Sequence, residues 1–376
     1  MVVAIGALAV IGILFVYSAS FIAEDQPASR YQRQAMWLVI GAVCYLCVAL
    51  SDYRRLSREA WWVFGGTIVL LVLVLLVGTK VYGARRWLMF LGVSIQPAEF
   101  AKIAFVMVLA RYLSRPDLDL DTWRTMGSVL LIAGIPFVLI VAEPDLGTAM
   151  VFLPVAFVMM LVARLRTRML VTLASAGIVG SVIVLSAVLL PERLGCNEET
   201  QERIINCVGL KLYHKSRLET FLDPDKDPLG AGWNKMQSEI AIGSGGLMGK
   251  GYLNGTANIL GFLPKTVAPT DFIFAVVAEE KGFMGATTVL LLFCVVIGSG
   301  MWAAVSANDK LGRLLCVGVS TLIFTHVFVN VAMTVGILPI AGIPLPLMSS
   351  GGSFVVGMLA GLGMIQSVYA RRRYLR

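Results

Sequence analysis

Asp271 combines a reactive side chain with an unusual position in the chain. It stands in PKTVAPTDFIF, residues 264–274, where a long polar stretch re-enters an apolar run. A carboxylate at the edge of a membrane is costly to bury and is by default a candidate for function. Gly-rich turns, Gln and Ser side chains, and further charges within apolar segments occur elsewhere in the chain. Together they predict a polar cavity that opens to one membrane face, with Asp271 as its first candidate residue.

Two pairs of charged residues lie within or just before the helix that is expected to begin at Pro97. Pro97 suits the first turn of a helix, and Glu99 and Lys102 then lie three residues apart on one face. Such a buried pair either fixes helix packing or lines the cavity and orders the catalytic region. Arg85 and Arg86 either hold a phosphate at the membrane surface or anchor the chain at the interface. The residues alone leave both questions open.

Two tight, irregular stretches add further polar groups. Glu143 and Asp145 lie in a turn between two apolar segments. Asp145 could merely cap the next helix, but two carboxylates at a membrane-embedded turn favour a polar cavity. Residues 343–353, IPLPLMSSGGS, bring Pro and Gly to membrane depth, which is allowed only where the backbone is buried in protein or lines a water-filled cavity. The hydroxyl and N–H groups of this stretch could bind an anionic ligand.

The polar stretch 191–270 contains the remaining candidates. Gln237 and Ser238 lie in residues 233–242, whose apolar spacing predicts a short amphipathic helix lying on the membrane. The Gly-rich run that ends near Lys250 fits no nucleotide-binding register, so no nucleotide is expected. Flexible backbone there still suits a phosphate or sugar ligand. The full set of predicted cavity residues is Arg85, Arg86, Gln96, Glu99, Lys102, Asp145, Gln237, Ser238, Lys250, Ser350, Gly351 and Gly352.

The composition predicts an all-α, polytopic membrane protein. The chain has 376 residues, of which 58% are hydrophobic and 14% charged, and a mean hydropathy of +0.82, whereas a soluble domain is about a quarter charged. The run 272–304 carries Glu279 and Glu280 in its first third, which is therefore expected to lie outside the lipid. About ten transmembrane helices are expected, within one domain over 1–376, at 1–22, 35–51, 60–78, 97–113, 127–142, 148–163, 169–190, 272–304, 314–335 and 353–370.

The charges of the loops set the expected orientation. One set of loops holds fifteen Lys and Arg residues, and the opposite short loops hold five. Because Lys and Arg concentrate in cytoplasmic loops, both termini are expected in the cytoplasm and the long loop, about 191–270, outside it. The net charge of +8 then reflects nearby anionic lipid rather than nucleic acid. Cys196 and Cys207, in the oxidising outer compartment, are expected to form a disulfide that staples the loop.

Five motifs in order resemble the SEDS family, the shape, elongation, division and sporulation proteins of bacteria. DPLGAG at 227–232 and GT at 255–256 are more similar to the elongation branch, RodA, than to the division branch, FtsW. The five motifs are QPAEFAK at 96–102, EPDLGTA at 143–149, QS at 237–238 with IGSGG at 242–246, TDFIF at 270–274 with EE at 279–280, and GIPLP at 342–346 with SGG at 350–352.

The chain departs from the family pattern in several places. Lys265 stands where the family usually has Glu, Pro269 stands where His is usual, and the link before Asp271 is about two residues longer. The loop that carries Asp271 is therefore expected to be set differently. The segment around Cys196 and Cys207 also looks unusual. The basic cytoplasmic tail usual before the first helix is missing, so a trimmed or misassigned start is expected.

The resemblance implies a peptidoglycan glycosyltransferase that polymerises lipid II at the outer face of the bacterial cytoplasmic membrane. It also implies a partner, a class B penicillin-binding protein that cross-links the product. In the family, the aspartate that matches Asp271 is the essential one. The pair that matches Glu99 and Lys102 lies in the central cavity of the family fold.

General-base catalysis by Asp271 is the mechanistic hypothesis. The acceptor hydroxyl must lose a proton as it attacks the anomeric carbon, and a carboxylate within hydrogen-bond reach can take it. The leaving group is a lipid pyrophosphate, which Arg85, Arg86 and Lys102 could stabilise, together with a divalent cation such as Mg²⁺ or Mn²⁺.

Two other functions remain open. Intramembrane charges on ten helices also fit a lipid II flippase, and a scaffold that recruits or activates a transpeptidase is a third reading. Against the flippase, the helices show no obvious inverted repeat, and the polar residues concentrate on one face rather than at the midplane. Neither alternative readily explains why candidate ligand groups cluster at that face. A division-type polymerase also remains an alternative to the elongation type.

Overall fold

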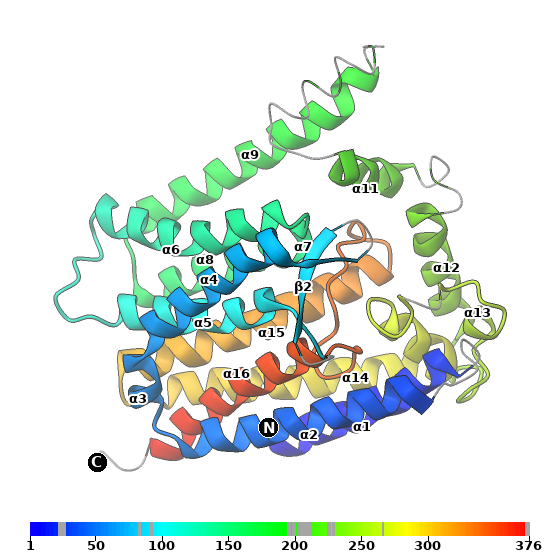
Figure 1. Ribbon diagram of the computed structural model, residues 1–376, viewed down its shortest axis with the longest axis horizontal. Coiled ribbons are helices and arrows are strands. Elements are labelled where there is room, and N and C mark those ends of the chain that lie inside the picture. The colour runs from blue at the N-terminus through cyan, green and yellow to red at the C-terminus, as the bar shows by residue number, and fades with distance from the viewer. Residues whose placement is uncertain are drawn as a thin grey trace.

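The computed structural model shows a bundle of long helices (Figure 1). It describes residues 1–21, 28–81, 84–90, 93–193, 197, 201, 203, 212–223, 227, 230–264 and 267–372. The elements are α1 (Val2–Ser20), α2 (Ala28–Leu50), α3 (Tyr53–Arg58), α4 (Ala60–Val77), β1 (Thr79–Val81), β2 (Ala84–Phe90), β3 (Val93–Ile95), α5 (Pro97–Leu113), α6 (Trp123–Ala142), α7 (Leu146–Met150), α8 (Phe152–Ala163), α9 (Thr167–Arg193), α11 (Leu212–Leu222), α12 (Ala231–Ser244), α13 (Thr256–Ile259), α14 (Ile273–Val305), α15 (Lys310–Thr334) and α16 (Gly352–Arg371).

The predicted polytopic helical fold is confirmed. Each predicted apolar segment coincides with one helix or, for 148–163, with α7 and α8 together. Within the described ranges, nine helical spans are long and apolar enough to cross a membrane. The tenth predicted segment is α5, which has 17 residues. It is buried along almost its whole length because α4, α6, α8, α15 and α16 pack around it, as expected for a helix that is apolar on most faces.

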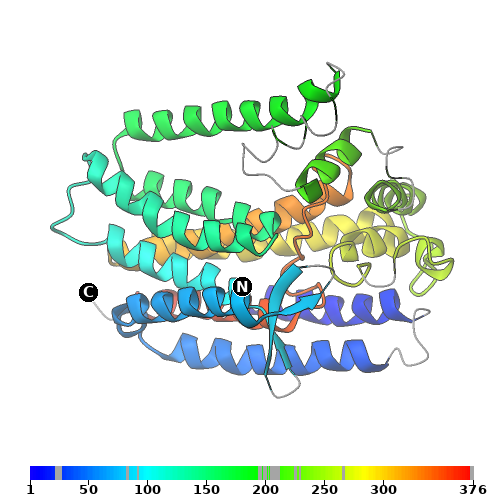
Figure 2. The same cartoon turned by 45° about the horizontal axis from the view of Figure 1, so that its top comes forward.

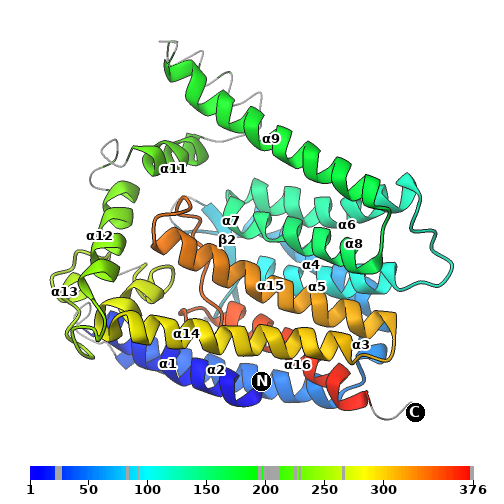
Figure 3. The ribbon, with the colours of Figure 1, turned by 180° about the vertical axis from the view of Figure 1, so that it is seen from behind.

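The ends of the bundle differ in character. The extramembrane elements α11, α12 and α13 gather at one end, whereas α1 begins and α16 ends away from them (Figure 3). Both ends of the described chain therefore lie on the same side, as expected when α5 is counted as a span beside the nine others. Helix α9 runs along the edge of the bundle, apart from α6 and α8 (Figure 2), and only 6% of its most apolar window is buried. The core lies instead around α5, α15 and α16.

A small antiparallel sheet, which the sequence pattern did not predict, connects α4 to α5. Its strand order is β1-β2-β3, and Thr79 pairs with Trp87 while Leu88 pairs with Ile95. Successive side chains of a strand point to opposite faces. Arg85 and Arg86, adjacent on β2, therefore leave the strand in opposite directions.

Helix α14 changes direction at Gly282, where φ is 65° and ψ is −163°. Glycine adopts this backbone conformation readily because it has no Cβ. The segment before the break is buried in the protein, and Glu279 and Glu280 are 0% and 1% exposed. The segment after it presents exposed apolar side chains such as Phe283 and Leu291. Gly282 thus separates a protein-buried part of α14 from a part that faces lipid.

Gly282→Ala is predicted to destabilise the protein, because the new Cβ would lie 2.4 Å from the backbone N of Gly249 and 2.6 Å from the carbonyl of Leu247. Strain of this kind is expected to cost about 1–3 kcal/mol, measured as a lower melting temperature of the purified protein in detergent. Gly298→Ala, on the same helix, is the matched control, since no atom lies within 4 Å of its added Cβ. Equal melting temperatures for the two variants would contradict this account of the break.

Candidate functional site

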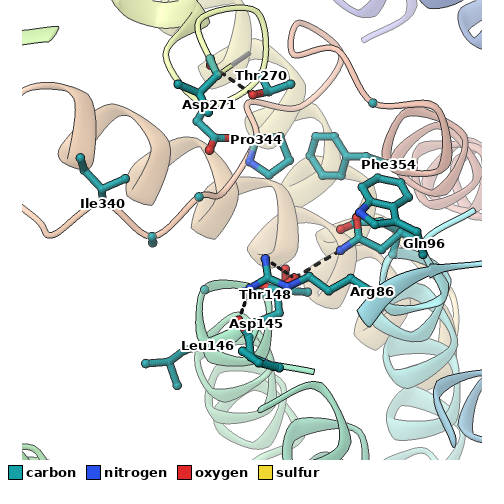
Figure 4. A pocket seen from close by; sticks show the side chains of 18 of the residues that line it. Arg86, Gln96, Asp145, Leu146, Thr148, Thr270, Asp271, Ile340, Pro344 and Phe354 are labelled. Atoms are coloured by element: carbon teal, nitrogen blue, oxygen red, sulfur yellow. Dashed lines mark hydrogen bonds and ion pairs between the residues drawn. The ribbon is translucent and has the colours of Figure 1, made fainter. Parts of the chain in front are cut away.

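A cavity of about 1020 Å³ lies where β2, α7, α11 and the loop between α15 and α16 meet. Figure 4 shows two opposing walls: Thr270 and Asp271 stand on one side, and Arg86, Gln96 and Asp145 stand on the other. The predicted residues that line this cavity are Arg86, Gln96, Glu99, Asp145, Asp271, Ser350 and Gly351.

Asp271 ends a series of turns that precedes α14. The side-chain amide of Asn330, on α15, donates to the backbone oxygens of Asp271 at 2.9 Å and of Ile343 at 2.7 Å. This bifurcated contact ties the aspartate to the loop between α15 and α16. Burial raises the pKa of Asp271 to about 6, although the charge of Arg217 and a hydrogen bond from Thr270 act in the opposite direction. The carboxyl group is therefore ionised at neutral pH but more basic than an ordinary aspartate.

The loop between α15 and α16 is irregular, but its polar groups form hydrogen bonds within the protein. The hydroxyl of Ser349 donates to the carbonyl of Thr270 and accepts the N–H of Leu345 at 2.8 Å. The N–H of Ser350 donates to the carbonyl of Pro269 at 2.9 Å. As the sequence indicated, this backbone is held within protein. It forms part of the cavity wall and clamps the turn that carries Asp271.

The opposite wall is built around Asp145. Its carboxylate accepts the N–H of Thr148 at 3.2 Å, which caps α7, and it also accepts the side-chain amide of Gln96 at 3.3 Å. The guanidinium of Arg86 lies 3.7 Å from the same carboxylate. Arg86 also donates to the carbonyls of Glu143, at 3.2 Å, and of Pro144. The two alternatives for Asp145 are thus both realised, since it caps a helix and faces the cavity.

Glu99 and Lys102 form the predicted ion pair, with 2.8 Å between Oε2 and Nζ. Glu99 contributes to the cavity wall, whereas Lys102 is buried beneath it, with a side chain only 1% exposed. The Lys102 ammonium also contacts Nε2 of His326 at 2.9 Å, and Nδ1 of His326 lies 3.3 Å from the carbonyl of Pro344. No sequence pattern predicted a role for His326. The structure places it between the ion pair and the loop that precedes α16.

Several predicted residues do not line the cavity, and each has another contact. Arg85 leaves the other face of β2 and donates to the carbonyls of Leu75 and Leu76. An added Cβ at Gly352 would meet the ring of Trp37 at 2.2 Å, so this glycine permits close packing instead. The cavity role predicted for Arg85, Lys102 and Gly352 is therefore not supported by their positions.

The residues predicted from the long loop do not line the cavity either, because they lie where the outer elements contact the bundle. Gln237 and Ser238 are buried where α12 packs on α14 and α15, and the Ser238 hydroxyl donates to the carbonyl of Thr334 at 2.8 Å. The ammonium of Lys250 lies 2.7 Å from the buried carboxylate of Glu279. These three side chains secure the outer elements to the bundle rather than line the cavity.

The atypical residues of the long loop lie largely outside the described part of the chain. The disulfide predicted between Cys196 and Cys207 falls there, as does Lys265. Pro269 is described, and its carbonyl joins the turn before Asp271 to the loop that precedes α16.

Arg217 is a cavity residue that sequence reasoning missed. It lies on α11, and its guanidinium donates to the carbonyl of Ile340 at 2.7 Å. Its charge opposes the rise in the pKa of Asp271. No local motif marks it, because its position depends on how α11 packs against the distant loop before α16. The signal available in the sequence was a basic residue in a stretch of the long loop that mixes polar and apolar side chains.

Comparisons with known proteins agree with this fold. A family model named for FtsW, RodA and SpoVE, and described as a cell cycle protein, matches residues 1–374. Peptidoglycan glycosyltransferase MrdB of Escherichia coli (strain K12) is 36% identical over 364 residues, which cover 96% of this chain and 92% of that protein. Peptidoglycan glycosyltransferase RodA of Treponema pallidum (strain Nichols) is 35% identical over 419 residues, with coverage of 97% and 96%.

A solved structure is similar over almost the whole length. It concerns the structural coordination of polymerization and crosslinking by a peptidoglycan synthase complex, and the matching chain has a TM-score of 0.76 and 26% identity, covering 99% of this chain and 97% of its own length. Fold and cavity together define a multi-pass membrane protein with a polar site at one end of its bundle. The chain belongs to the FtsW/RodA/SpoVE family, also called SEDS, and is a peptidoglycan glycosyltransferase.

Arg86→Ala is predicted to lower the rate of glycosyl transfer by about 10²–10³-fold, the usual effect of removing one group that stabilises developing charge. Arg86 lies on the wall of the cavity opposite Asp271 (Figure 4). The rate is measured as polymer formed from labelled lipid II by purified protein in liposomes. Arg85→Ala, the neighbour on the outer face of β2, is the matched control and should keep near wild-type activity. Equal losses in both variants would contradict the assignment of Arg86 to the site.

Proposed function

We propose that this chain polymerises lipid II into glycan strands at the outer face of the bacterial cytoplasmic membrane, with Asp271 as the general base. The observation that carries the proposal is the opposition of two walls in one cavity. A carboxylate whose pKa burial raises to about 6 stands on one wall, and the Arg86 guanidinium stands on the other.

The bond changes of the reaction suit this arrangement. The oxygen of the acceptor hydroxyl forms a bond to the anomeric carbon of the donor, while the bond from that carbon to the pyrophosphate oxygen breaks. In a displacement that inverts the anomeric carbon, the base and the leaving group lie on opposite faces of the sugar. Asp271 takes the hydroxyl proton, and Arg86 offsets the charge that develops on the pyrophosphate. Ser350 and Gly351 also line this cavity.

The biological setting is proposed from the relatives. RodA and MrdB resemble this chain over nearly its whole length, so we assign it to cell elongation. The similar solved chain belongs to a peptidoglycan synthase complex that couples polymerization to crosslinking, so we expect a class B penicillin-binding protein of the elongation type as partner. Copurification with the division-type transpeptidase instead would overturn this assignment.

The residues that the structure describes offer no set of protein ligands for the divalent cation expected from the chemistry. Within the described residues, no group of three His, Cys, Asp or Glu side chains could hold a metal ion. Mg²⁺ is usually bound through one or two carboxylates together with substrate phosphates. We propose that Mg²⁺ or Mn²⁺ enters only with the pyrophosphate of the substrate, and no step above depends on it.

Asp271→Asn is predicted to abolish polymerisation at pH 7.5 while lipid II binding is retained, because the amide cannot accept the proton. In the wild type, the rate should rise about tenfold per pH unit below pH 6 and level off above it, since only the ionised carboxylate is a base. Asp223→Asn is the matched control, because Asp223 is an exposed aspartate at the end of α11.

Two outcomes of this assay would overturn the proposal. Full activity of Asp271→Asn would remove the general base. Transfer of labelled lipid II across the bilayer, with no polymer from the wild type alone or with its transpeptidase, would favour the flippase.

Removal of divalent cations by EDTA is predicted to slow polymerisation and to leave the melting temperature of the substrate-free protein unchanged. Both follow from a cation that is held only with substrate phosphates. A fall in melting temperature on EDTA treatment would indicate a metal site within the protein itself.

A further inference from the structure

A second cavity, of about 410 Å³, lies at the opposite end of the bundle from the glycosyltransferase site. It is bounded by the loop before α6, the end of α8 and the start of α15. Helix α15 begins at this cavity and, after 25 residues, ends beside the loop that lines the first one; a helix of that length spans roughly 36 Å. The distribution of Lys and Arg assigns this end to the cytoplasm. Glycosyl transfer at the outer face does not use it.

Three cations line this cavity: Arg164, Lys310 and Arg313. In the described part of the chain, none of the three forms an ion pair with a carboxylate. The carboxylate beside them, Asp309, is already engaged by the guanidinium of Arg54 at 3.0 Å. It also accepts the N–H of Gly312 at 2.8 Å and the Tyr53 hydroxyl at 3.0 Å. The cavity therefore keeps an excess of positive charge.

Arg164 adopts a backbone conformation that favours glycine. It ends α8 with φ 68° and ψ 42°, in the left-handed region, where helices usually place Gly because a Cβ is strained. A residue held in this region points to a use for its side chain. Here the side chain brings a guanidinium to the cavity, where it can bind phosphate oxygens in a bidentate manner.

We propose that this cavity binds the phosphate of an anionic phospholipid headgroup from the cytoplasmic leaflet. Basic pockets between membrane helices on the cytoplasmic side suit such headgroups. The walls also include the apolar side chains of Leu120, Val162 and Leu314, which can pack against the glycerol and the first carbons of the acyl chains. Free phosphate shares the chemistry of the headgroup but gains nothing from these apolar walls.

The test uses the full-length protein, purified in a zwitterionic detergent and titrated with dioctanoyl phosphatidylglycerol. Arg164→Ala and Arg313→Ala are each expected to weaken binding about fivefold, the effect of one basic residue on an anionic lipid. Arg166→Ala and Arg168→Ala remove the same charge just after Arg164, from positions that are exposed like Arg164 but lie outside the cavity. These matched controls should bind as the wild type does.

Arg164→Gly separates binding from folding. It removes the cation but relieves the left-handed backbone, so affinity should fall as in Arg164→Ala while the melting temperature stays equal or rises. Equal weakening by the Arg166 and Arg168 controls would overturn the proposal in favour of diffuse surface charge. Equal affinity for dioctanoyl phosphatidylcholine, or no saturable binding, would also overturn it. Inorganic phosphate that binds as tightly as phosphatidylglycerol would support a phosphate site but overturn the lipid as its source.

Discussion

Backbone polar groups that enter an apolar bundle must find partners within the protein, and the loop between α15 and α16 depends most on this constraint. Gln34 reaches it from α2, with its amide donating to the carbonyl of Ser349 at 3.0 Å and its oxygen accepting the N–H of Gly351 at 3.3 Å. Asn330 holds the same loop together with the backbone of Asp271. The candidate base is therefore positioned by a hydrogen-bond network that links α2, α15 and the turn before α14.

Buried charges obey the same constraint in two ways. The partly exposed Lys250 pairs with the fully buried Glu279, and loss of Lys250 would leave the Glu279 carboxylate buried without compensation. Glu143 follows the other route: burial, with Asp145 nearby, raises its pKa to about 8 despite the charge of Arg86. Glu143 is thus mostly protonated at neutral pH, which avoids the cost of a second negative charge beside Asp145.

The sequence was sufficient wherever the relevant contact is local or the apolar run is long. Runs of about 20 apolar residues gave the helices, and the spacing of three between Glu99 and Lys102 gave their ion pair. The sequence was insufficient where packing between distant segments determines the position of a side chain. Arg85 and Arg86 could not be told apart without the pleat of an unpredicted strand, and Arg217 reaches the cavity only because α11 packs beside the loop before α16. Lys250 was predicted to line the cavity, but its ammonium contacts Glu279 instead.

The break at Gly282 has a mechanical consequence for an enzyme that works in a fluid bilayer. Transmembrane helices adjust to changes in bilayer thickness by tilting, and the lipid-facing part of α14 must do the same. The part before Gly282 is fixed by protein contacts, because the carbonyls of Glu279 and Glu280 accept the N–H groups of Lys250 and Gly251 at 3.0 Å. The change of direction at Gly282 lets the lipid-facing part of α14 take a tilt that differs from the direction of the segment that follows Asp271.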